Sequence, residues 1–310
     1  MHSDPHPRQA ISSGATVAFG ARRVELGERR FLHAGRLRWL RAVAWVFPLF
    51  LLVVASSMWV AARVGAWWPE ASGLAQLAPY LASVATALAI YALAVRLCED
   101  RWPSEIAMRP LLPHLVVGLL LGAAMFAAVM GIMAACGLYE IRFAGPAPAW
   151  GAVGKALQAG VVEELMLRAI LLRLLWRAFG PWVAFAASAA LFGLGHIGNP
   201  NATVFAAVCI ALEAGIMLAA FYVLTGRLWM SIGVHVAWNF TQGYLFGAAV
   251  SGTAMGPAIA HSTARAGAPE WLTGGAFGPE ASLPGLVVCM VVGLAATWRA
   301  WRAGRFSGER

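Results

Sequence analysis

Long apolar stretches dominate this chain of 310 residues and limit what it can fold into. A helix of about twenty apolar residues is long enough to cross the hydrocarbon core of a bilayer, and eight stretches of this kind follow one another along the chain. They cover residues 42–62, 76–97, 113–135, 152–175, 181–197, 203–225, 228–246 and 283–298. The sequence therefore predicts an all-α fold, a polytopic integral membrane helix bundle with about eight transmembrane helices and no sheet.

The composition agrees with a membrane setting. Charged residues make up 12% of the chain and hydrophobic residues 60%, whereas a soluble domain typically carries about 25% charged residues. The four cysteines form no C-x-x-C pair, which argues against a disulfide framework and against a thiolate metal site. About forty mostly polar residues precede the first apolar stretch, so we expect no cleavable signal peptide. The cysteines are Cys98, Cys136, Cys209 and Cys289.

Arginines crowd the beginning of the chain. Eight of them lie in residues 1–41, which we interpret as an arginine-rich cytoplasmic segment ahead of a membrane domain that covers residues 42–310. No aromatic residues alternate with them as in a nucleic-acid-binding motif, so we expect contact with anionic lipid headgroups and no nucleic acid. The eight are Arg8, Arg22, Arg23, Arg29, Arg30, Arg36, Arg38 and Arg41.

The later arginines indicate how the chain crosses the membrane. Eight spans place both termini on one side of the bilayer, and that side would also hold most of the later arginines. The opposite side would hold little more than Arg63, Arg142 and Arg265. Loops rich in arginine favour the cytoplasm, so we predict that both termini are cytoplasmic. The arginine- and alanine-rich composition suggests a bacterial source, and therefore the inner (plasma) membrane.

Three small groups of polar residues interrupt the apolar stretches. Ionisable groups within a bilayer are costly and face a protein interior or a water-filled cavity, so each group marks a candidate functional site. Together they supply a carboxylate pair, two imidazoles and an amide, which is the composition of a hydrolytic site. The groups are Glu163, Glu164 and Arg168 in the fourth stretch, His196 at the end of the fifth, and His235 and Asn239 in the seventh.

The two glutamates are expected to have different tasks. Glu164 and Arg168 are four residues apart and share a helix face, where an ion pair lowers the cost of burying both charges. Glu163 lies about 100° around the helix from Glu164 and cannot use Arg168 in the same way. A buried carboxylate without a cationic partner is a suitable general base. The competing interpretation is a satisfied polar kink inside the bundle.

The histidines and the asparagine add further chemistry. Glu163 and His196 lie on either side of a turn at Gly180 and Pro181, which falls halfway between them, so an antiparallel hairpin would bring their side chains together. The next pair shares one helix face, where an imidazole and an amide can donate hydrogen bonds to an oxyanion. That pair is His235 and Asn239.

Zinc is an alternative at the same residues. Glu163, His196 and His235 could hold the metal and leave its fourth position to water, although the H-E-x-x-H motif of zinc proteases is absent. Glu213 lies in the middle of the sixth stretch, outside the three groups. We expect it to have a structural role, either in a pair with Arg168 or a histidine or as part of a cavity wall.

The three groups, in this order, resemble the motifs of the CPBP family. The chain has E-E-x-x-x-R at residues 163–168, F-x-x-x-H at residues 192–196 and H-x-x-x-N at residues 235–239. The family comprises the CAAX-processing, Rce1-type intramembrane proteases and their bacterial relatives, also called Abi proteins. The resemblance covers about residues 150–246. Each motif alone is weak, and the specificity comes from their order on successive apolar stretches.

The resemblance implies a role for each matched residue. Glu163 and His196 would activate the attacking water, while His235 and Asn239 would stabilise the tetrahedral oxyanion. A reaction without a cofactor is preferred, because these motifs lack a third histidine and include an asparagine; zinc is the alternative. The supporting residues would be Glu164 and Arg168.

The predicted function is therefore that of an intramembrane endopeptidase. Its partners would be the lipid bilayer and a membrane-associated protein or peptide, whose peptide bond it hydrolyses. A transporter or proton-coupled carrier would also bury glutamates, but the chain has no obvious internal repeat. A catalytically silent membrane scaffold is the third alternative, and the complete set of catalytic residue types argues against it.

Overall fold

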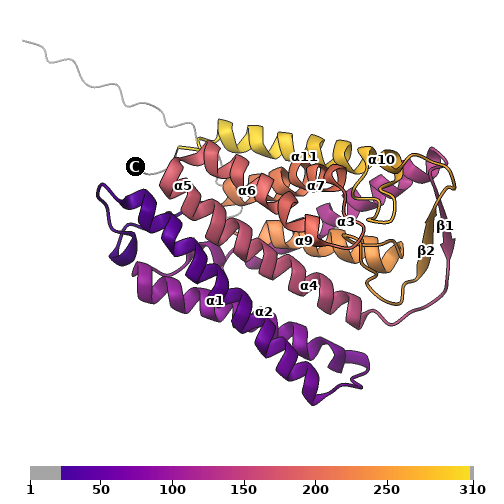
Figure 1. Ribbon diagram of the computed structural model, residues 1–310, viewed down its shortest axis with the longest axis horizontal. Helices are drawn as coiled ribbons and strands as arrows, with labels where there is room; N and C mark the ends of the chain where they lie inside the picture. The colour runs from indigo at the N-terminus through magenta and orange to yellow at the C-terminus, as the bar shows by residue number, and fades with distance from the viewer. Residues whose placement is uncertain (1–21, 308–310) are drawn as a thin grey trace, which may run out of the picture.

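Helices account for nearly all regular structure in residues 22–307, the part of the chain that the computed structural model describes (Figure 1). About half of the predicted N-terminal segment, including Arg8, lies outside the described residues. The start of α1 (Arg38–Trp67) and the end of α11 (Leu283–Arg302) lie at the same end of the bundle, on the left in Figure 1. This placement agrees with an even number of crossings between them.

The first half of the chain consists of three long helices and a short strand. After α1 come the 3₁₀ turn η3 (Gly73–Leu77), α2 (Ala78–Glu99), the 3₁₀ turn η4 (Ser104–Ile106), α3 (Leu111–Ala135) and β1 (Tyr139–Phe143); the 3₁₀ turn η2 (Arg30–Leu32) precedes α1.

The second half contains shorter helices with π-helical segments between them. These elements are α4 (Trp150–Glu164), the π-helical η5 (Leu165–Leu172), α5 (Arg173–Phe179), α6 (Pro181–Gly195), the 3₁₀ turn η6 (His196–Gly198), α7 (Val204–Ile210), the π-helical η7 (Ala211–Gly215), α8 (Ile216–Thr225), α9 (Trp229–Phe240), the π-helical η8 (Thr241–Leu245), β2 (Ala260–Ala264) and α10 (Glu270–Thr273), followed by α11.

The prediction of a helical membrane bundle is confirmed, since all eight apolar stretches are helical. Six of the helical segments described in residues 22–307 are long and apolar enough to cross a membrane by themselves. The other two predicted spans are the charged run from α4 to α5 and the short run from α9 to η8. Both are largely buried among the other helices, so neighbouring helices rather than lipid cover their polar residues. The six segments are Arg38–Trp67, Gly73–Glu99, Leu111–Ala135, Pro181–Gly198, Val204–Thr225 and Leu283–Arg302.

The expectation of no sheet is wrong in one place. Strands β1 and β2 pair antiparallel, with Tyr139 opposite Ala264 and Phe143 opposite Ala260. The ribbon lies at the end of the bundle away from the start of α1 (Figure 1). It brings the segment after α3 against the loop that follows η8. Each strand is only five residues long, and the site motifs lie between the two strands in the sequence. Neither strand therefore contains an apolar run long enough to be recognised from the sequence.

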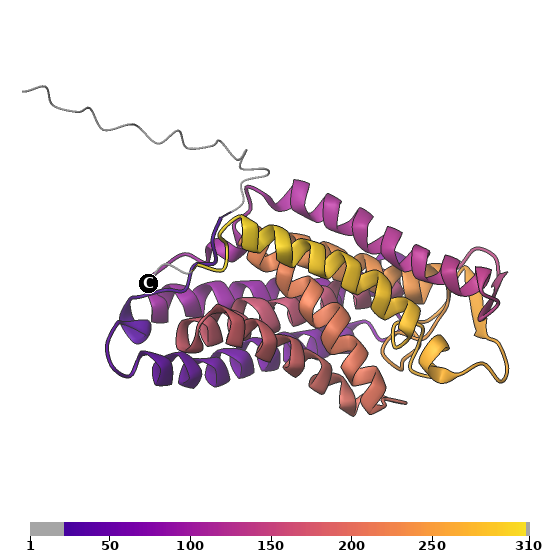
Figure 2. The ribbon, with the colours of Figure 1, turned by 90° about the horizontal axis from the view of Figure 1, so that it is seen from above.

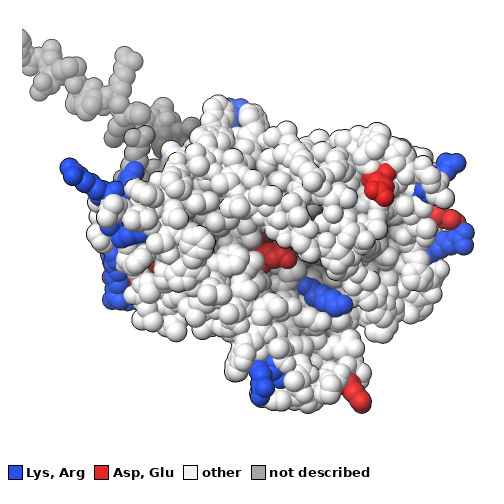
Figure 3. Space-filling model, viewed as in Figure 1, with Lys and Arg blue, Asp and Glu red and all other residues white. Residues whose placement is uncertain are grey.

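Charged side chains lie mainly at the two ends of the long axis. Figure 3 shows basic groups gathered at one end, a smaller mixed group at the other, and a broad, mostly uncharged face between them. An acidic and a basic group interrupt the middle of this face (Figure 3). The band of uncharged surface suits a bilayer, with polar side chains at both interfaces.

A buried network of charges joins α2, α5 and η4 at the arginine-rich end. Arg173 donates to Glu99 at 2.7 and 2.9 Å, and Arg101 contacts Glu99 and Glu105, both at 2.8 Å. Burial alone would raise the pKa of Glu105, but Arg101 and Arg173 hold it at about 2. Some of the arginines that signal topology in the sequence are therefore buried ion-pair partners in the fold.

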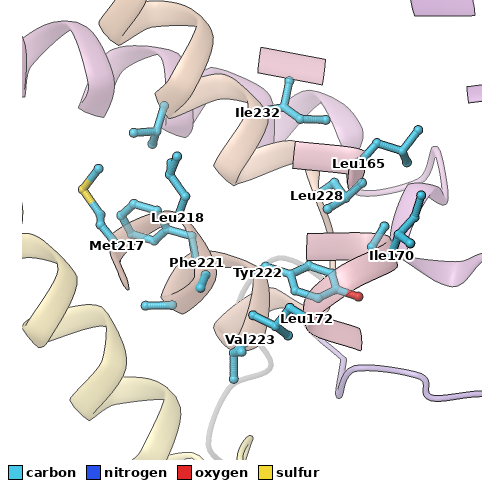
Figure 4. Packing of buried hydrophobic residues seen from close by; sticks show 14 of the residues in the cluster. Leu165, Ile170, Leu172, Met217, Leu218, Phe221, Tyr222, Val223, Leu228 and Ile232 are labelled. Atoms are coloured by element: carbon cyan, nitrogen blue, oxygen red, sulfur yellow. The ribbon is translucent and has the colours of Figure 1, made fainter. Parts of the chain in front are cut away.

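The largest apolar cluster includes residues of η5, α8 and α9, which pack against one another (Figure 4). Leu165 and Ile170 of η5 belong to it together with Tyr222 of α8 and Ile232 of α9. Figure 2 shows that α3 and the hairpin of α6 and α7 lie on opposite sides of the bundle. Glu164 of α4 and His235 and Asn239 of α9 consequently lie inside a closely packed interior.

Helix α9 is held by close contacts with backbone atoms of its neighbours. A Cβ at Gly122 of α3 would lie 2.3 Å from the Val234 carbonyl oxygen, and one at Gly118 would lie 2.5 Å from another α9 carbonyl oxygen. A Cβ at Gly160 of α4 would lie 2.5 Å from Val236 Cγ2. Small residues four apart let membrane helices approach this closely. These glycines therefore set the position of the helix that carries His235.

Replacing Gly122 by valine should push α3 and α9 apart, because the new side chain would overlap backbone atoms that cannot rotate away. Overpacking typically costs about 1–3 kcal/mol, so we expect a clearly lower midpoint temperature for thermal unfolding of the purified protein. Gly131→Val is the matched control, since a Cβ at Gly131 of the same helix meets nothing within 4 Å. Equal midpoints for the two variants would contradict this account of the packing.

Candidate active site

Three π-helical segments lie beside the predicted site residues. Segment η5 begins directly after Glu164, η7 contains Glu213, and η8 starts just after the helix that carries Asn239. π-Helical turns are rare and frequently occur at functional sites. A π-turn inserts into the regular helical repeat and rotates the residues that follow it. Each π-segment therefore changes the angle between the helical residues before it and those after it.

Glu164 has two partners at the centre of the site. Its Oε2 lies 3.2 Å from Arg168 Nε, and both side chains are fully buried. Its Oε1 lies 3.0 Å from Nδ1 of His235 on α9. Arg168 also donates to the carbonyl oxygen of Ala214 at 3.0 Å, and its guanidinium lies 4.7 Å from the centre of the Phe192 ring. The ion pair expected from the four-residue spacing is present, and it also fixes the imidazole.

His235 lies between the two glutamates. Its Nδ1 faces Glu164, and its Nε2 lies 3.9 Å from Glu163 Oε2. A carboxylate only accepts hydrogen bonds, so we assign a proton on Nδ1 to the contact with Glu164. The Glu163 side chain is 31% exposed whereas that of Glu164 is 0% exposed. Of the two carboxylates, Glu163 is therefore the one that a substrate or water can reach.

His196 lies where α6 changes into η6. Its Nδ1 lies 2.8 Å from the carbonyl oxygen of Phe192. Because a carbonyl oxygen only accepts, the proton is assigned to Nδ1, and Nε2 is left with a lone pair in the neutral ring. The Phe192 ring lies beside both imidazoles, with its centre 4.9 Å from that of His196 and 6.2 Å from that of His235. The Phe192 ring therefore packs against both imidazole rings.

The direct contact expected between Glu163 and His196 does not form. Among residues 22–307 the ion-pair partner of Glu163 is His235, and His196 pairs with no carboxylate. The expectation assumed two regular helices with equal arms on either side of the turn at Gly180. The π-helical turns of η5 lie on one arm and break that symmetry.

A small cavity adjoins His196, His235 and Asn239. The space in it that is open to a water molecule is about 30 Å³, and a buried water needs about 10–15 Å³. Asn239 is 9% exposed and makes no side-chain hydrogen bond with any other described residue. Its amide is therefore free to donate to a molecule in the cavity.

Glu213 forms part of the cavity wall, one of the places expected for it. It makes no ion pair with Arg168 or with a histidine of the described chain. Its Oε2 is buried without a hydrogen-bond partner. Glu213 therefore lacks both the ion pair that Glu164 makes with Arg168 and the hydrogen bond that Glu164 makes with His235.

The cavity includes one residue that the sequence analysis missed. Glu280 belongs to the loop of residues 247–282, and its Oε1 accepts from the Ser251 backbone N–H at 2.5 Å and from the Ser251 hydroxyl at 2.9 Å. Its Oε2 lies 3.4 Å from the indole nitrogen of Trp238. The loop thus folds back into the bundle and forms part of the cavity wall. A glutamate in a loop of small residues looks solvated in the sequence, and no local pattern marks it as buried.

The candidate zinc ligands do not converge. Glu163 and His235 lie near each other, but Nδ1 of His196 is committed to the Phe192 carbonyl. In the described part of the chain, no three His, Cys, Asp or Glu side chains are grouped so that they could hold a metal ion. This arrangement does not fit a zinc site, and we derive no reaction step through a metal.

One family model matches the segment that contains the motifs. Residues 145–241 match the Rce1-like family, described as type II CAAX prenyl endopeptidase Rce1-like. The matched segment runs from just before α4 to the start of η8 and includes Glu163, His196, His235 and Asn239. Glu280 lies outside it. No curated protein and no solved structure is significantly similar to the chain.

Replacing Glu164 by glutamine should lower stability, because Arg168 would remain buried without its counter-charge. Breaking a buried ion pair typically costs about 3–5 kcal/mol, and we expect a loss of this order in denaturant unfolding of the purified protein. Glu140→Gln is the control, since it breaks the exposed pair of Glu140 and Arg142 and should change stability little. An unchanged unfolding midpoint for Glu164→Gln would show that the buried pair does not support the site.

Proposed function

We propose that this multi-pass membrane protein, whose residues 145–241 match the Rce1-like family of CAAX-type proteases, hydrolyses a peptide bond in a membrane-associated protein or peptide. The family supports a peptidase that acts in the bilayer. The observation that carries the rest of the proposal is His235, held between a buried and an accessible glutamate at the edge of a cavity. The arginine- and alanine-rich composition leads us to infer a bacterial inner membrane as its location.

The attacking water would be activated by Glu163 and His196. Glu163 is accessible and has no arginine or lysine partner in the described chain, so its carboxylate can accept a proton from water. The lone pair on Nε2 of His196 is a second acceptor, because Nδ1 is bonded to Phe192. Since the two side chains do not touch, a water molecule between them is the natural nucleophile. The accepted proton would then pass to the leaving amine as the C–N bond breaks.

The oxyanion would be stabilised by His235 and Asn239. With Nδ1 donating to Glu164, His235 can donate from Nε2 only as the doubly protonated imidazolium. The carboxylates of Glu164 at Nδ1 and Glu163 near Nε2 would be the counter-ions of that cation. The amide of Asn239 has no competing partner and lines the same cavity. Both donors are held on one helix, so little reorganisation is needed when the negative charge develops.

Glu163→Gln should reduce turnover strongly while the protein stays folded, because it removes the accessible base with little change of shape. Loss of a general base typically costs roughly 10²–10⁴-fold in rate. The measurement compares new peptide termini in membrane proteomes of cells that produce the wild type or the variant. Glu270→Gln, at an exposed glutamate of α10, is the control and should process the same substrates as the wild type. Normal processing by well-folded Glu163→Gln protein would exclude this mechanism.

We propose that the reaction needs no metal, because the candidate ligands do not converge. The purified enzyme should therefore keep its activity on an identified substrate after exhaustive chelation, and elemental analysis should find less than one zinc per chain. If zinc takes part, activity should disappear with the chelator and return with one equivalent of zinc. That result would instead assign Glu163, His196 and His235 as ligands in a rearranged site.

A further inference from the structure

Two glutamates form an acidic part of the cavity wall. They are Glu213 from η7 and Glu280 from the long loop, two elements far apart in the sequence. Their exposed fractions are 1% and 3%. No lysine or arginine is among the described residues that line the cavity. Two buried carboxyl groups that make no ion pair with a lysine or an arginine are unfavourable, so this wall calls for a cation or a proton.

The two carboxyl groups differ in how well they are satisfied. Glu280 accepts two hydrogen bonds from Ser251 and one from Trp238. Burial raises the pKa of Glu280 even though these donors and the nearby His196 oppose the shift. Glu213 accepts no hydrogen bond from any described residue, and its Oε2 is buried. The unsatisfied acceptor capacity is therefore concentrated on Glu213.

The described residues offer no lysine or arginine to this wall, and the only basic groups that line the cavity with it are the imidazoles of His196 and His235. Arg168, the basic side chain of the first motif, is bound to Glu164 and to the Ala214 carbonyl. The remainder of the cavity is mainly apolar, with Met217 and Leu218 among the lining residues. A mainly apolar lining that also contains two carboxyl groups suits a side chain with a methylene stem and a charged tip.

We propose that Glu213 and Glu280 bind the ammonium group of a substrate lysine side chain next to the bond that is cut. This inference rests on the proposed function, since the same cavity contains His196, His235 and Asn239. The open space of about 30 Å³ corresponds to about two waters, and an ammonium group is close to a water molecule in size. The planar guanidinium of arginine is larger, so lysine is the better fit.

Binding can be tested without turnover. The probe is n-butylammonium, and 1-butanol is the neutral molecule of nearly the same shape. A ligand that binds the folded state raises its unfolding temperature, and we expect n-butylammonium to raise that of the purified wild type by about 2–4 °C beyond 1-butanol. Glu213→Gln should abolish this difference. Because Glu213 accepts no hydrogen bond from the described chain, the variant should fold.

Three further variants make the result specific. Glu280→Gln should also lose the response, whereas Ser251→Ala, which removes one hydrogen bond to Glu280 but keeps its charge, should retain it. Glu140→Gln, at the exposed pair with Arg142, should respond like the wild type. An equal effect of n-butylammonium and 1-butanol on the wild type, or an undiminished response of Glu213→Gln, would overturn the proposal. Binding to Glu163→Gln should persist, so the outcome is independent of the catalytic mechanism.

Cleavage of peptides then tests the position of the lysine. A library of membrane-anchored peptides with acetylated N-termini excludes binding through a terminal amine. The wild type should cut preferentially beside lysine and not beside acetyl-lysine, which keeps the stem but lacks the charge. Glu213→Gln should lose at least tenfold of this preference. Cleavage by the wild type without regard to lysine would refute the proposal, while the family assignment and the role of Glu163 would stand.

Discussion

The contact that the site depends on is the ion pair between Glu164 and Arg168 in a fully buried environment. There is no water there to solvate either charge, so the pair has to be completed by the protein itself. The second oxygen of Glu164 meets His235, and Arg168 reaches a carbonyl of η7 and the ring of Phe192. One charge pair thereby links segments from all three motifs. The three motifs, which are separate in the sequence, therefore meet at this one ion pair.

Close backbone packing makes that contact possible. Gly118 and Gly122 on one side and Gly160 on the other let α9 lie against its neighbours with almost no side chain between them. The π-helical segments then turn polar side chains toward a common centre at the points where a regular helix would carry them past it. The small residues allow the helices to approach closely, and the π-helical turns affect where the polar side chains point. Neither the close approach of the helices nor the direction of the side chains depends on helix propensity.

Sequence reasoning worked where a feature is local or strongly periodic. The apolar stretches, the four-residue pair of Glu164 and Arg168, and the greater accessibility of Glu163 all follow from helical geometry. It failed where geometry depends on distant segments. The π-turns that separate Glu163 from His196 have no simple sequence signal, and neither does the pairing of β1 with β2. The burial of Glu280 depends on Ser251 and Trp238, which only the folded chain brings to it.

The return of the loop 247–282 into the bundle bears on how this fold is divided into modules. The segment that matches the family model ends at residue 241. A fragment cut there would contain every motif residue but would lack Glu280, the Ser251 anchor and helix α11, which packs against α8. Its cavity would lack the part of the wall that Ser251 and Glu280 form. The smallest autonomous unit of this protein is therefore larger than the segment by which it is recognised, and grafting that segment alone onto another membrane scaffold would transplant an unfinished site.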